Sequence, residues 1–158
     1  MNRKSIFALL FAATISTAFA GEPTQSKQAH AYLPGMGEIM GATQMRHAKL
    51  WFAGKAENWP LANYELGEIR EGFGDAVVYY PVFKEGVPVS KILDKFTDTP
   101  LKELEIAIRN KNEKDFQKAF DDLTSACNSC HHAANRGYIA IIRPNKPPFS
   151  NQNFNASH

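Results

Sequence analysis

Apolar residues recur every three or four positions along much of this chain, which is the spacing of helices that bury one face. The most regular stretch begins near Asn112 and is expected to end at Gly137. Its apolar face is continuous and consists of Phe116, Ala119, Phe120, Leu123, Cys127, Cys130 and Ala134. The pattern predicts a helix that presents both cysteines of the chain to a core.

A similar pattern predicts a first helix from Met36 to about Lys55. The residues on its buried side are Met36, Ile39, Met40, Thr43, His47, Leu50 and Trp51. Met45 points roughly the opposite way, at about 100° per residue. We therefore expect Met40 and His47 on one face, two turns apart, and Met45 elsewhere.

Proline, glycine and asparagine mark the limits of the other elements. Asn58 and Pro60 predict the start of a second helix, which Pro81 ends. Residues 81–98 read as an irregular connection, and Asp98-Thr99-Pro100 predicts the start of a third helix over residues 101–110. The pattern thus predicts an all-α fold with four helices over residues 36–136. Residues 137–158 contain several prolines and are predicted to form an extended C-terminal tail, packed in its first part and mobile at its end.

Residues 1–20 have the organisation of a secretory signal peptide. A basic start and an apolar stretch precede Ala18-Phe19-Ala20, which is a small-x-small cleavage site. The apolar stretch is too short to span a bilayer stably, and no later stretch approaches the about 20 apolar residues that a membrane helix needs. Residues 21–35 are predicted to form a loose N-terminal arm. We expect export to the periplasm and no stable membrane span after cleavage.

The motif Cys127-Asn128-Ser129-Cys130-His131 is typical of covalent c-type haem attachment. Positions i and i+3 of a helix lie on one face, so both sulfurs can reach one porphyrin, where each thiol adds to a vinyl group. His131 follows at i+4 from Cys127 and can bind the iron as the proximal ligand. The motif predicts one covalent haem c.

The alternatives for these five residues are a disulfide, a redox dithiol and half of a zinc site. A structural zinc site takes about four protein ligands, and the chain has no further cysteine. A thioredoxin-type dithiol follows a strand in a βαβ unit, whereas the pattern around Cys127 is helical. The spacing favours haem attachment.

The first predicted helix offers candidates for the distal side of such a haem. Met40 is the leading sixth ligand of the iron, and His47 is the distal alternative. Without a haem, Met40 would be read as a core gap-filler and His47 as a hydrogen-bonded core histidine. His132 is rotated by about 100° from His131 and is expected to be exposed and not a ligand.

The charge balance excludes one class of partner. The chain has 18 Lys and Arg against 16 Asp and Glu, and the predicted signal peptide holds two of the basic residues and none of the acidic ones. The remainder is formally neutral, whereas a nucleic-acid-binding domain is expected to be clearly basic. We therefore expect no nucleic acid among the partners, and redox partner proteins instead.

Four predicted helices with a haem-attachment motif late in the last one resemble the class II cytochromes c, the family of cytochrome c′ and its low-spin relatives. The resemblance is specific at Cys127, Cys130 and His131 and covers the layout of about residues 36–136. It implies an antiparallel four-helix bundle with the haem bonded to the last helix. It also implies a distal position at or beside Met40, where methionine gives a six-coordinate electron carrier.

The chain departs from that family at several places. Family members often carry an aromatic residue and an arginine three and four positions after the haem histidine, where this chain has Ala134 and Asn135, with Arg136 one later. His47 is a second potential ligand, and the tail is extra. Relatives often dimerise through the first two helices, which implies a possible homodimer.

The predicted function is that of a periplasmic monohaem c-type cytochrome, a one-electron carrier and not an enzyme. With Met40 and His131 both bound, substrate cannot reach the iron, and methionine raises the reduction potential relative to bis-histidine ligation. The alternative is a gas-binding (NO or CO) or peroxide-handling haem protein with an open distal site, where His47 would donate a hydrogen bond. A peroxidase usually adds a distal arginine, and Arg46 is expected to point away.

Overall fold

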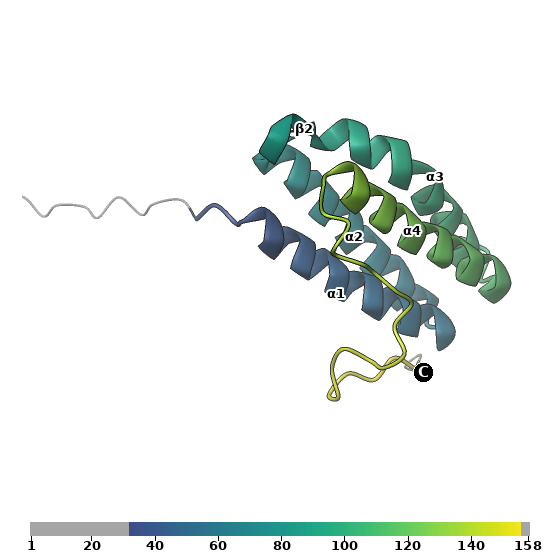
Figure 1. Cartoon of the computed structure of the whole chain (residues 1–158). Coiled ribbons are helices and arrows are strands. Elements are labelled where there is room, and N and C mark those ends of the chain that lie inside the picture. Colours follow the sequence, from purple (N-terminus) through teal and green to yellow (C-terminus); the bar gives the residue numbers. More distant parts are fainter. Residues whose placement is uncertain (1–31, 156–158) are drawn as a thin grey trace, which may run out of the picture. The chain divides into compact units, whose positions relative to one another are not determined.

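The computed structural model describes residues 32–155, and within them the chain forms four α-helices and one two-stranded sheet (Figure 1). The helices are α1 (Met36–Lys55), α2 (Trp59–Tyr79), α3 (Val89–Arg109) and α4 (Glu113–Ala133). Consecutive helices run in opposite directions and pack side by side, and α4 also contacts α1. The predicted all-α bundle is therefore confirmed, while the predicted signal peptide and most of the predicted arm lie outside the described residues.

None of these four helices is both long and apolar enough to cross a membrane.

Two short turns, between α1 and α2 and between α3 and α4, are built alike. Two residues after the end of each preceding helix, the chain takes the left-handed conformation, at Glu57 (φ 54°) and Lys111 (φ 53°). The N–H of the next residue, Asn58 or Asn112, bonds back to the carbonyl five positions earlier at 2.9 Å. The side chain of the same asparagine then caps the following helix. We call this end of the bundle the turn end.

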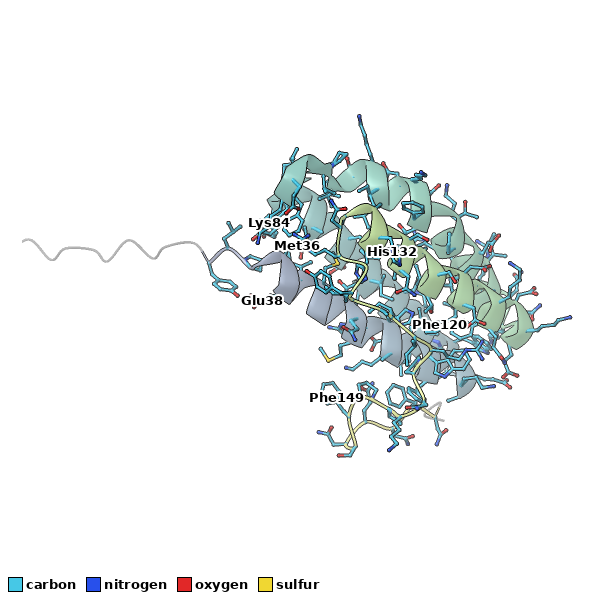
Figure 2. All side chains as sticks on the ribbon, in the orientation of Figure 1. Met36, Glu38, Lys84, Phe120, His132 and Phe149 are labelled. Carbon is cyan, nitrogen blue, oxygen red and sulfur yellow. The ribbon has the colours of Figure 1, made fainter. Side chains whose placement is uncertain are left out.

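A small hairpin joins α2 to α3 at the opposite end. Strand β1 (Val82–Phe83) pairs antiparallel with β2 (Val87–Pro88) across a 3-10 turn, Lys84–Gly86. Gly86 has a φ of 78°, which a glycine adopts without strain. We call this end the cavity end, for the hollow described below. Figure 2 shows Met36 and Lys84 at this end and Phe120 toward the other.

Helix α3 corrects the prediction for residues 81–98. It begins at Val89 and continues through Pro100, whereas the sequence predicted a helix start at Asp98-Thr99-Pro100. A proline inside a helix costs about 3 kcal/mol, because it removes one backbone hydrogen bond and crowds the preceding turn. Burial of residues at helical spacing on both sides of Pro100 offsets that cost. The buried residues of α3 are Val89, Thr97, Pro100, Leu101, Leu104, Ala107 and Ile108.

Aromatic side chains fill the core at the turn end. Phe116 and Phe120 have no exposed surface, and the rings of Trp51 and Trp59 lie beside them. The ring centroid of Phe116 lies 6.0 Å from that of Trp59 and 6.1 Å from that of Phe120. Gly54 makes room for this cluster, since a Cβ at that position would overlap the Phe116 ring. The aromatic cluster at the turn end is therefore closely packed.

The end of α4 lies earlier than predicted. The helix ends at Ala133, and Asn135 (φ 57°) takes a left-handed conformation two residues before Gly137, where the sequence predicted the end. Backbone hydrogen bonds from Asn135 to His132 (3.1 Å) and from Arg136 to His131 (2.7 Å) close the turn. Asparagine tolerates this conformation better than most residues do, which explains the earlier stop.

The tail then runs back along α4 and α1, as the yellow end of the chain shows in Figure 1. Arg143 donates to the Asp121 carboxylate of α4 through Nε and Nη2, and its guanidinium carbon lies 4.4 Å from the ring centroid of Trp51. Farther on, Phe154 is buried with its ring 5.6 Å from that of Phe52. The sequence predicted that only the first part of the tail packs. The correction is that packing continues to Phe154.

Candidate functional site

The cavity end encloses a hollow of about 350 Å³ lined by residues from all four helices, the hairpin and the tail. This volume lies within the range of about 300–1,000 Å³ that is usual for ligand pockets. Most of the lining is apolar. Among the described residues that line it, Arg136 is the one Lys, Arg, Asp or Glu. Its guanidinium lies 5.5 Å from the ring centroid of Phe83 and 3.3 Å from the Glu85 carboxylate.

All five residues that the sequence singled out line this one cavity. Cys127, Cys130 and His131 reach it from the last two turns of α4. Met40 and His47 reach it from α1, which packs beside α4. Residues that are nearly a hundred positions apart in the sequence thus share a single apolar hollow.

The two cysteines are half-buried and are not joined by a disulfide. Burial raises the pKa of the Cys127 thiol to about 12 and that of the Cys130 thiol to about 11. Both are therefore protonated at neutral pH. Redox-active dithiols depend on a lowered thiol pKa, so this environment does not favour a redox dithiol.

The ring of His131 is held by the tail. Its Nδ1 lies 2.7 Å from the carbonyl oxygen of Ile139. Because a carbonyl only accepts, Nδ1 must carry the proton and donate it, which leaves a lone pair on Nε2. Histidines that bind metals commonly donate their other ring N–H to a backbone carbonyl in this way. Sequence reasoning missed Ile139, because this contact follows no periodic pattern.

His47 lies deeper, with 4% of its surface exposed and its ring 4.3 Å from that of Phe120. Its Nε2 lies 2.9 Å from the hydroxyl oxygen of Thr124, and that hydroxyl itself donates to the Phe120 carbonyl. The Nε2–H of His47 is therefore the donor to Thr124. Burial lowers the pKa of His47 to about 4, so the ring is neutral. As an iron ligand, His47 would have to use Nδ1 or give up this bond.

The wall that α1 contributes contains two methionines and two glycines. Met36 and Met40 both line the cavity, one helical turn apart. Gly37 and Gly41 lie next to them, and a Cβ at either glycine would have no protein atom within 4 Å. At these two glycines the wall exposes backbone, which a flat ligand could approach closely. The sequence placed Met36 on the same face but gave it no role in the site.

Three other residues lie where the sequence predicted. Arg46 points away from the cavity and pairs with Glu65 (3.3 Å) and Glu68 (2.8 Å) of α2. Met45 is absent from the cavity lining, and His132 is exposed. Within residues 32–155, the cavity included, no three His, Cys, Asp or Glu side chains converge as a metal site would require.

A scan of protein-family models and searches of curated proteins and of solved structures found no significant match to this chain.

Proposed function

We propose that this chain is a monohaem c-type cytochrome that carries single electrons in the periplasm between redox partner proteins. One observation carries the proposal. The thiols of Cys127 and Cys130 and the free Nε2 of His131 converge on one apolar cavity from a single helix end. Covalent attachment of a porphyrin through two vinyl groups uses two thiols, and its iron takes a histidine nitrogen as the proximal ligand.

The residues present fit a haem in three respects. The lining is mostly apolar, as the macrocycle requires, and its one charged residue, Arg136, is balanced by Glu85. The bare backbone at Gly37 and Gly41 leaves space against α1. Each thiol can add its S–H across one vinyl double bond, which needs no oxidant. Bound haem would supply a one-electron iron couple, which this chain would hold through Cys127, Cys130, His131 and Met40.

The arrangement supports a carrier over a gas-binding or peroxide-handling protein. The thioether of Met40 is available at the cavity, and it would exclude exogenous ligands while raising the potential. In the alternative function, His47 would serve as a distal donor, but its Nε2–H is already bonded to Thr124. Arg46, which could assist peroxide chemistry, is paired with two glutamates of α2.

The mass of the purified chain tests haem attachment. After denaturation and extraction with acidified solvent, the wild-type polypeptide should retain the added mass of one haem. The Cys127→Ala/Cys130→Ala double variant should lose it, whereas Ser129→Ala, which lies between the two cysteines, should keep it. A wild-type chain of unmodified mass would contradict the proposal.

The axial ligand distinguishes the two functions. With Met40 bound, the oxidised protein should be low-spin and show the weak methionine–iron band in the near infrared. Met40→Ala should abolish this band, lower the potential and open the iron to carbon monoxide, whereas Met45→Ala should leave the band intact. Loss of the band in Met36→Ala alone would move the ligand by one turn. A wild-type protein that is high-spin and binds carbon monoxide would overturn the carrier in favour of gas binding.

A further inference from the structure

Asn128, one of the two spacers between the motif cysteines, is bonded to the tail. Its side chain accepts a hydrogen bond from the Ile141 N–H at 2.7 Å and donates one to the Ile141 carbonyl at 2.9 Å. A single amide side chain thus satisfies both backbone groups of one residue thirteen positions away. Ile141 is itself buried, with 9% of its surface exposed. Together these contacts fix the register of the tail over the end of α4.

That register decides which carbonyl meets the histidine. Ile139, two residues before Ile141, accepts from His131 Nδ1 at 2.7 Å. The Ile139 N–H donates to the Arg136 carbonyl at 2.8 Å, so residues 136–139 form a hydrogen-bonded turn between the helix end and Ile141. A slip of one residue at Ile141 would turn the Ile139 carbonyl away from His131.

The other spacer, Ser129, has no such role. Its hydroxyl donates to the Ser125 carbonyl at 3.0 Å, within α4 itself. The two residues between the cysteines therefore differ in function: one is bonded to its own helix and the other holds a distant segment.

We propose that Asn128 is a positioning residue for the proximal histidine. By fixing Ile141, it keeps the Ile139 carbonyl on His131 Nδ1, which holds Nε2 free and oriented and strengthens it as an electron donor to iron. This inference rests on the proposed function, since it concerns His131 as an iron ligand. According to this inference, the tail also contributes to the reduction potential.

The test compares the Asn128→Ala and Ser129→Ala holoproteins with the wild type, after the haem mass of each has been verified. Two quantities are measured: the midpoint potential, and the exchange of the His131 ring N–H with solvent, by NMR of protein labelled at histidine nitrogens. Asn128→Ala should speed that exchange by about fivefold to tenfold, as expected for the loss of a supporting hydrogen bond. It should also raise the potential, because a weaker donor stabilises ferric iron less. Ser129→Ala should change neither.

A conservative variant guards against a merely structural effect. Asn128→Asp keeps an oxygen that can accept from the Ile141 N–H but loses the donor, so its ring N–H exchange should lie between that of wild type and that of Asn128→Ala. The added carboxylate lowers the potential by its own charge, so this variant is compared by exchange alone. If Asn128→Ala does not fold, the ring N–H exchange of Asn128→Asp against Ser129→Ala decides. Unchanged ring N–H exchange and potential, together with faster exchange of the Ile141 amide, would show that Asn128 only anchors the tail and would overturn the inference. An unmodified wild-type mass is a different result, which removes the proposed function and this inference with it.

Discussion

The two ends of the bundle use the same four helices for opposite purposes. At the turn end, Phe116 and Phe120 are fully buried beside the rings of Trp51 and Trp59. At the cavity end, the same helix faces diverge around about 350 Å³ of hollow. Interiors normally pack as densely as organic crystals, so a large apolar hollow in a small domain is a costly feature. The comparison shows that the described side chains fill the core at one end and leave an apolar hollow at the other, which is where the proposed haem would lie.

The largest effect should follow from emptying the packed end. Phe116→Ala removes a fully buried ring and should destabilise the protein by about 3–5 kcal/mol. Met36→Ala, whose side chain adjoins the hollow, should cost less than half as much. Urea unfolding followed by circular dichroism measures both. Equal losses would mean that the two ends are packed alike.

A pH effect of similar size should come from His47, which sits between the two ends. The unfolded histidine has an ordinary pKa near 6.5, whereas burial lowers the pKa of folded His47 to about 4. The unfolded state therefore binds a proton first as the pH falls, and stability is lost between about pH 6.5 and pH 4. The loss should reach about 3 kcal/mol, from the standard 1.36 kcal/mol per pKa unit.

Two variants separate the effect of His47 from that of an exposed histidine. His47→Gln should lack this loss when unfolding free energies at pH 7 and pH 4.5 are compared, and His132→Gln, at an exposed position, should retain it. Identical pH profiles for His47→Gln and wild type would show that His47 is not buried as neutral imidazole.

Replacing glycine by alanine at two positions of α1 should change the free energy of unfolding in opposite directions. Gly54→Ala puts a methyl group into the Phe116 ring, which its aromatic neighbours prevent from moving, and should cost about 1–3 kcal/mol. Gly41→Ala meets nothing and should gain about 0.5–1 kcal/mol from helix propensity. Thermal unfolding of both variants tests this.

Gly41→Ala can also be tested with and without the two motif cysteines, which asks whether a bound group lies against this wall. If haem is bound as proposed, the gain from Gly41→Ala should be complete in the Cys127→Ala/Cys130→Ala chain and smaller in the wild-type background, where the haem would occupy this space. A full gain in both would place the bound group away from this wall.

The smallest effects belong to the helix ends. Lys111→Gly should stabilise by about 0.5–1 kcal/mol, because a left-handed lysine is strained and glycine is not. Asn135→Gly should gain less, since asparagine tolerates that conformation. Melting temperatures compare the two, and a larger gain at Asn135 would contradict this ordering.

Most of the fold could be predicted because α1, α2 and α4 show apolar periodicity, and because Asn58 and Asn112 are clear caps of α2 and α4. The start of α3 could not, because the local rule at Pro100 was outweighed by burial on both sides of it, a tertiary effect. The site residues on helices were placed by periodicity. Ile139 and Asn128 were missed, because contacts of an irregular tail leave no period in the sequence.

The anchoring of the tail has a consequence for the order of folding. Asn58, in the turn between α1 and α2, donates through its side chain to the carbonyl of Asn155, 97 residues farther along the chain. Closing so long a loop costs entropy that only the finished helices can offset. The two helical hairpins should therefore form first and the tail should dock on them afterwards. The segment that carries the Ile139 carbonyl would then be among the last to settle in refolding, and among the first to exchange its amides in the native protein.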